Sequence, residues 1–165
     1  MSRVQAIIDP IIKARAYTED LLSQVPLDDW FRQPSEGITH VAWQVGHIAV
    51  AEYALALKRI RGVRDEDAEL MPSDFPQAFG KGSIPASDPS RYPSAQEIQD
   101  VFERIHLQVL AELAVLPEAV LDEPTDPHPM FVTKQGALQW AGYHEVFHTG
   151  QIALLRRLFG HEPLR

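Results

Sequence analysis

Apolar side chains recur in four segments of this chain with the three- and four-residue spacing of amphipathic α-helices. These segments are residues 3–25, 40–61, 94–116 and 134–159. Nowhere do apolar and polar residues alternate for long enough to predict a β-strand. The pattern therefore predicts an all-α fold built from four helices.

Capping residues mark the expected ends of these helices. Ser94, followed three residues later by Glu97, forms a capping box that predicts the start of the third helix. Thr133 and Gly160 are placed to cap and to end the fourth helix. For the first helix, a start near Arg3 and a regular start only at Asp9-Pro10 are both open. For the second helix, Thr39 is expected as the N-cap and Gly62 as the end.

The longest connection, residues 62–93, contains five prolines. An unstructured stretch of that length is uncommon inside a compact domain. In a helix bundle it can serve as a crossover that lets the second and third helices run parallel. A linker between two domains is the competing interpretation, but two helices alone could not bury their apolar stripes. We therefore predict a single four-helix-bundle domain over residues 1–165.

Composition and charge narrow the class of protein. The 165 residues are 45% hydrophobic and 23% charged, an ordinary balance for one globular domain. The chain has no cysteine, which excludes disulfides, thiolate metal sites and cysteine nucleophiles. The net charge of −8, with scattered Lys and Arg residues, argues against a nucleic-acid partner. No leader or membrane-spanning run is evident, so we expect a cytoplasmic protein without a membrane partner.

Histidines carry the strongest chemical signal. His144 and His148 lie four residues apart, so on a helix their rings are about 40° apart on one face. That spacing lets two imidazoles bind one metal ion. His47 lies on an inward-facing line of the second helix, and the alternative to metal binding is that all three are hydrogen-bonded core residues. The stripe assigned to the fourth helix around its two histidines consists of Ala137, Ala141, Ile152, Leu155 and Phe159.

Two Glu-x-x-His motifs suggest a carboxylate-bridged di-iron site as an alternative. They are Glu103 with His106 and Glu145 with His148. Such a site requires inward-facing carboxylates, whereas Glu103 is expected to face solvent and His47 would have no role. The remaining histidines are expected to be surface or capping residues: His40, His106, His128 and His161.

Four further residues are candidates for the surroundings of a metal ion. Trp43 and Trp140 each precede a proposed ligand by one helical turn and could wall a pocket. Gln151 could orient His148 or a bound substrate. Glu145 is a weak candidate for a general base, and no catalytic residue is otherwise assigned. For each of the four, a purely structural role is the alternative.

The second helix is apolar nearly all round, which predicts burial on more than one side. The face opposite His47 is the one we expect to pair with a second copy of the chain in a homodimer. That face consists of Val41, Val45, Ile48, Ala49 and Leu55.

The chain resembles the DinB-like superfamily. Its His-x-x-x-His-x-Gly-Gln element at residues 144–151 is similar to the closing signature of that family. Residues 43–48, Trp-Gln-Val-Gly-His-Ile, are similar to its second-helix histidine motif. The loop segments 79–82 and 88–94 resemble it too, so the likeness covers essentially the whole chain.

The resemblance implies a four-helix bundle of up-down-down-up topology that holds one metal ion and often dimerises. The ligands implied by position are His47, His144 and His148, and all three are present. The superfamily includes mycothiol-dependent maleylpyruvate isomerases and bacillithiol transferases, beside many members without a known reaction.

Three neutral imidazoles would leave a divalent ion with its full charge and an open coordination position. Zinc and nickel are the ions that we expect here. Such an ion can lower the pKa of bound water or of a substrate thiol. Without a cysteine in the chain, a thiolate has to come from a low-molecular-weight thiol. We therefore expect a metal-dependent enzyme on small molecules, either a thiol-dependent transferase or an isomerase. The alternatives are a metal-dependent hydrolase and a non-catalytic, stress-responsive metal-binding protein.

Overall fold

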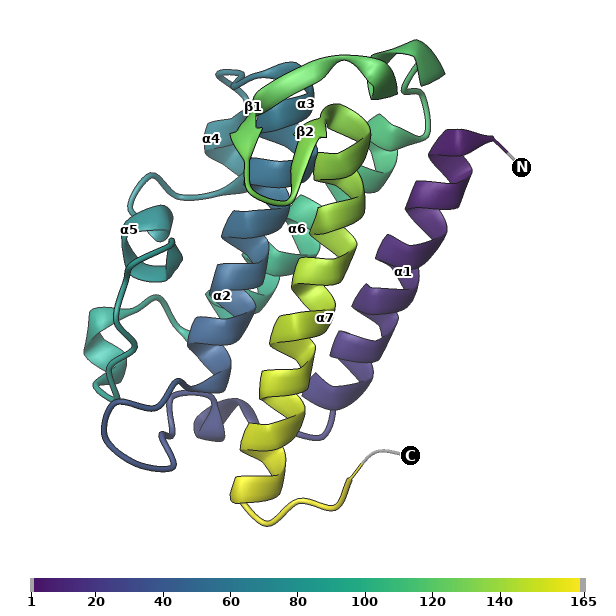
Figure 1. The fold of residues 1–165 in the computed structure, drawn as a ribbon. Helices are drawn as coiled ribbons and strands as arrows, with labels where there is room; N and C mark the ends of the chain where they lie inside the picture. The colour runs from purple at the N-terminus through teal and green to yellow at the C-terminus, as the bar shows by residue number, and fades with distance from the viewer. Residues whose placement is uncertain (1, 164–165) are drawn as a thin grey trace.

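The computed structural model describes residues 2–163, so Met1 and residues 164–165, at the ends of the predicted domain, lie outside it. The fold is mostly helical, as predicted (Figure 1). Its long helical stretches are α1 (Arg3–Leu22), α2 (Val41–Glu52) with its continuation, α6 (Ala95–Leu113) and α7 (Lys134–Leu158). In Figure 1, α7 lies between α1 and α2, and α6 lies behind α2.

The second helical stretch continues from α2 through a π-helical segment, η2 (Tyr53–Lys58), into α3 (Arg59–Arg61). Its N-cap is His40 and not the predicted Thr39, because Nδ1 of His40 accepts a hydrogen bond from the backbone N–H of Trp43 at 3.1 Å. The stretch ends at Gly62, as predicted, where a φ of +82° favours glycine.

The starts of α6 and α7 agree with the sequence, whereas α1 and α6 end three residues earlier than expected, at Leu22 and Leu113. The capping box of Ser94 and Glu97 is formed, and the side chain of Thr133 caps α7. α1 begins at Arg3 with Ser2 as its cap, so Pro10 lies inside the helix. Pro10 is exposed, which lets its ring project into solvent, and the missing N–H removes one helical hydrogen bond.

The crossover is not unstructured, contrary to expectation. It contains α4 (Asp67–Leu70), α5 (Phe75–Phe79) and a 3₁₀ turn, η3 (Pro89–Arg91). Two more 3₁₀ turns, η1 (Leu27–Asp29) and η4 (Glu118–Asp122), lie in the other connections. α5 packs on α2 at Gly46, where a Cβ atom would lie 2.5 Å from the ring of Phe79. A glycine at this point therefore lets α5 approach α2 closely.

A small β-hairpin, missed by the sequence pattern, precedes α7. Strands β1 (Pro124–His128) and β2 (Phe131–Thr133) are antiparallel, with His128 opposite Phe131. They are too short for a period-two signal, and two prolines in β1 argue against a strand. In Figure 1 the hairpin covers the start of α7 beside α3.

The apolar face that the sequence assigns to a dimer interface lies in the core of a single chain. Val41, Val45 and Ala49 are 0% exposed, Ile48 is 1% exposed and Leu55 is 7% exposed. They pack within the main apolar cluster, and α2 contacts both α6 and α7. The observation that suggested a two-fold interface is therefore explained by packing inside the chain, and the dimer prediction based on it is wrong for this face.

Four of the five residues in the predicted stripe of α7 are buried, but the buried face extends beyond that stripe. Its buried positions include the polar residues Glu145, Thr149 and Arg156. His144 and His148 are half-buried at the edge of this face instead of lying at its centre. Apolar periodicity misses the polar part of the buried face because it counts polar residues as outward-facing, although paired polar side chains can be buried.

A buried ionic cluster joins the four long helices, one side chain from each. Arg15 of α1 lies between Glu52 of α2 and Glu145 of α7, with N–O distances of 2.7 and 2.9 Å. His106 of α6 contacts Glu52 through Nδ1 at 2.8 Å. Arg15 also donates to the backbone carbonyl of Phe102, and its guanidinium carbon lies 3.4 Å from the centre of that ring. His106 is thus a buried, paired residue, contrary to the prediction of a surface position.

This cluster keeps its charges paired. Burial by itself raises the pKa of both carboxyl groups. At Glu52, the charge of Arg15 and the hydrogen bond from His106 outweigh burial and lower the pKa, whereas the pKa of Glu145 remains raised. A charge left alone here would be strongly destabilising because water cannot solvate it.

Among the helices formed by residues 2–163, none combines the length and apolar character that crossing a membrane requires.

We predict that Arg15→Met lowers the free energy of unfolding by about 3–5 kcal/mol, because it leaves two carboxylates buried without their partner. The matched control is Arg3→Met, which breaks the exposed ion pair with Asp122 and should change stability by less than about 1 kcal/mol. Urea denaturation followed by circular dichroism measures both. Equal losses in the two variants would contradict the assigned role of the cluster.

Candidate metal centre

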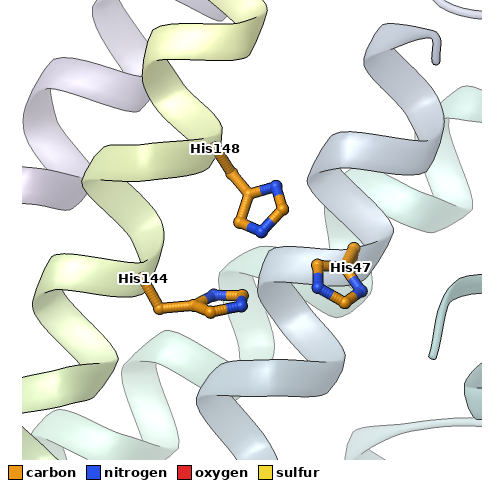
Figure 2. A group of neighbouring side chains, drawn as sticks. All are labelled: His47, His144 and His148. Carbon is orange, nitrogen blue, oxygen red and sulfur yellow. The ribbon is translucent and has the colours of Figure 1, made fainter. Parts of the chain in front are cut away.

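The structure brings together the three histidines that the sequence selects. His47 projects from α2 toward His144 and His148 on α7 (Figure 2). The ring centre of His47 lies 5.2 Å from that of His144 and 4.6 Å from that of His148. The ring centres of His144 and His148 are 4.5 Å apart. Each histidine offers one ring nitrogen, and these three nitrogen atoms lie within 4.8 Å of one another.

Hydrogen bonds determine which nitrogen of two rings is available to a metal ion. Nδ1 of His47 lies 2.6 Å from the backbone carbonyl of Phe79, and Nδ1 of His148 lies 2.6 Å from Oε1 of Gln44. Both oxygens can only accept, so each Nδ1 carries the proton and donates it. The lone pair of each Nε2 is therefore left for a metal ion.

The protonation state of the cluster also suits metal binding. Burial, followed by the charges of neighbouring histidines, lowers the pKa of His144 to about 4 and that of His148 to about 3. Burial also lowers the pKa of His47. All three rings are therefore neutral near pH 7, which is the form that binds metals.

The donor set fits one divalent transition metal ion. Two nitrogens bound to one tetrahedral zinc ion lie about 3.4 Å apart. Ring rotations of the order of 1 Å would bring the three nitrogens to that spacing. Within the described part of the chain, no carboxylate joins the histidines in this cluster. The three imidazoles would therefore leave the charge of an ion intact and part of its coordination shell open.

Gln44 binds the ring of His148, a contact that the sequence analysis did not predict. It is 0% exposed and contacts α7 from α2. While its Oε1 accepts from His148, its Nε2 donates to Oγ1 of Thr39 at 2.9 Å and to Oε1 of Gln151 at 3.1 Å. The predicted candidate Gln151 therefore acts on His148 mainly through Gln44, since its own Nε2 is 3.5 Å from Nδ1 of His148. A buried amide three residues before His47, on a helix of apolar residues, is the signal that could have identified it.

The two predicted tryptophans differ in their surroundings. Trp43 stacks on His47, with ring centres 4.7 Å apart and planes 8° from parallel, and its Nε1 donates to Oγ of Ser83 at 2.9 Å. Trp140 lies 6.2 Å from the ring of His128 and 5.8 Å from that of Phe147. Trp43 thus lies against a proposed ligand, whereas Trp140 lies toward the hairpin.

Glu145 does not face the three histidines and is no candidate for a general base. Its carboxylate is bound to Arg15 in the buried ionic cluster, and the residue is 3% exposed. It therefore has the structural role that the sequence analysis gave as the alternative, at a buried position. The di-iron alternative is also excluded, because Arg15 occupies the space between Glu145 and Glu52, and Glu103 is exposed.

We predict that Gln44→Met lowers the affinity for zinc by about tenfold to a hundredfold, because His148 loses the acceptor that fixes its tautomer and ring orientation. Gln44→Glu keeps an acceptor at the same place and should retain tight binding. Competition with a chromophoric chelator measures the affinity, and circular dichroism checks the fold. If Gln44→Met binds zinc as tightly as the wild type, Gln44 has no role in positioning His148.

Comparisons with known proteins identify the fold and the family of this chain. The solved structure of a conserved protein from Enterococcus faecalis superposes with a TM-score of 0.70 at 20% identity, covering 96% of this chain and 97% of that one, which supports the fold alone. None of the curated proteins matches the chain. The sequence matches the DinB superfamily model over residues 11–152, a range that contains all three histidines. This chain therefore belongs to the DinB superfamily.

Proposed function

We propose that this protein binds one divalent transition metal ion through Nε2 of His47 and His148 and one ring nitrogen of His144. We further propose that it acts there on small molecules, as a thiol-dependent transferase or isomerase. The observation that carries the proposal is the convergence of three neutral imidazoles, two of them with Nδ1 already engaged by an acceptor. When bound, an ion of this kind supplies Lewis acidity and lowers the pKa of a bound thiol or water.

The half-buried position of the ligands supports a reactive role over a purely structural one. Structural zinc sites are usually closed by four protein ligands. Here the described residues supply three histidines at the edge of a helix face, with no carboxylate or fourth imidazole in the cluster. Gln44 and the Phe79 carbonyl hold two of the rings in orientation, as supporting residues do in catalytic metal sites.

A thiol co-substrate suits the residues of this chain better than hydrolysis does. Activation of water for hydrolysis usually requires a general base nearby. The one carboxylate that the sequence offered for that purpose, Glu145, is bound to Arg15. A thiol, in contrast, can be delivered as a small molecule, and the chain has no cysteine of its own to supply one.

Several finer points belong to the same proposal. Zinc or nickel is the proposed metal, because both accept imidazole ligands. An up-down-down-up order of the long helices is supported by Figure 1, where α1 and α7 descend while α2 and α6 rise. A single domain over residues 1–165, a cytoplasmic location and the lack of a nucleic-acid partner stay predictions from the sequence.

The first test is metal content by plasma mass spectrometry, on protein purified without a histidine tag. We expect about one equivalent of a transition metal in the wild type after incubation with zinc or nickel, and strong loss in His144→Ala. His161→Ala, which alters a histidine outside the cluster, is the matched control and should keep its metal. Metal-free wild-type protein would refute the proposed site.

The second test, part of the same series, uses the cobalt-loaded protein to identify the reaction class. A thiol-dependent enzyme should bind small thiols at the ion, which changes the visible absorption of cobalt. Turnover of esters or amides without added thiol would favour a hydrolase instead. A spectrum unchanged by thiols and by exchangeable ligands, with loss of stability on metal removal, would identify a structural site.

A further inference from the structure

The crossover carries a lysine in the segment that contacts His47 and Trp43. The segment that follows α5 is bound to α2 at two points. The carbonyl of Phe79 accepts from Nδ1 of His47, and Oγ of Ser83 accepts from Nε1 of Trp43. Lys81 lies between these two anchors, flanked by two glycines, and is exposed. Within residues 2–163 its ammonium group makes no hydrogen bond or ion pair, so it is available to a ligand.

The hairpin and α3 bring two more basic side chains to the same region. His128, at the end of β1, stacks on Phe131 at 4.3 Å and lies 6.2 Å from Trp140, one turn before His144. Arg59 of α3 donates to the backbone carbonyl of Asp126 at 2.7 Å, and its guanidinium carbon lies 5.2 Å from the centre of the Phe131 ring. The hairpin thus holds His128 and Arg59 near the start of the helix that carries two proposed ligands.

The charges of the two cationic side chains affect the ionisation of His128. Partial burial, then the charges of Arg59 and Lys81, lower the pKa of His128. Both charged groups that lower this pKa are cationic side chains, so Arg59 and Lys81 lie within electrostatic reach of His128. Two basic side chains therefore gather around the hairpin next to the candidate metal centre, in a protein whose net charge is −8.

We propose that the metal centre receives a small molecule bearing a carboxylate, which Lys81 and Arg59 attract while another donor atom of the molecule reaches the ion. This inference rests on the proposed function, because it assumes an ion held by the three histidines. Trp43 stacks on the proposed ligand His47, and Trp140 lies 6.2 Å from His128, so apolar ring surface is present beside both groups and suits a molecule with an apolar or aromatic body. The substrate class is therefore a small carboxylate, neither a cation nor a neutral molecule.

The test compares 4-mercaptobenzoate with 4-mercaptobenzamide on the cobalt-loaded protein. The two thiols have the same rigid shape, and their ring keeps the carboxylate from chelating the ion that binds the sulfur. Titration followed in the visible bands of cobalt gives both dissociation constants. We expect the acid to bind about five- to tenfold more tightly at low salt, and this preference to shrink in high salt as charges are screened.

Two variants separate recognition by Lys81 from the general charge of the protein. Lys81→Gln should reduce the preference for the acid about three- to tenfold, toward equal binding of the two thiols. Lys13→Gln, the same change on the exposed face of α1, should leave the preference as in the wild type. Comparing the ratios of dissociation constants cancels the intrinsic difference between the two thiols.

The outcomes distinguish this inference from the proposed function. If cobalt does not bind, the metal centre itself is refuted. If cobalt binds but the acid and the amide bind equally, or neither binds, the carboxylate inference is overturned while the metal centre stands. A preference for the acid that persists in Lys81→Gln also overturns it, because the assigned basic group would then have no part in recognition.

Discussion

The buried ionic cluster around Arg15 is the constraint on which the arrangement of this fold depends. Arg15 binds Glu52 and Glu145, and His106 binds Glu52, so each long helix contributes one member. Because such charges tolerate burial only when paired, the cluster restricts how each helix can rotate or slide. On α7, residues lie about 100° apart, which places His144 and His148 about 100° and 60° to the same side of Glu145. Directing Glu145 into the core thereby directs both histidines toward α2.

The candidate metal centre is assembled by the segments between the helices as much as by the helices themselves. Gly46 admits the Phe79 ring, and this contact brings the Phe79 carbonyl to Nδ1 of His47. The same crossover supplies Ser83, which fixes Trp43 against His47. The long connection therefore orients a ligand, in addition to joining two helices.

The electrostatics of this region oppose those of the whole chain. The overall charge is −8, yet Lys81 of the crossover and Arg59 of α3 lie near His128 of the hairpin, whose ring is 6.2 Å from that of Trp140. Neutral imidazoles would leave the charge of a bound ion uncompensated. The ion proposed above and these two cationic side chains would then both attract an anionic ligand.

The sequence alone determined the helical class, several helix ends and the three histidines, because local periodicity, capping chemistry and ligand spacing depend only on near neighbours in the chain. Only the tertiary structure decided which faces are buried. Periodicity counts Glu145, Thr149 and Arg156 as outward-facing, yet their partners on α1 or in the turn that follows it allow burial. The second apolar face of α2 looked like a dimer interface because the sequence does not show that α6 and α7 both pack on this helix. The hairpin, the role of Gln44 and the position of Lys81 likewise depend on contacts between residues distant in sequence, which no local pattern records.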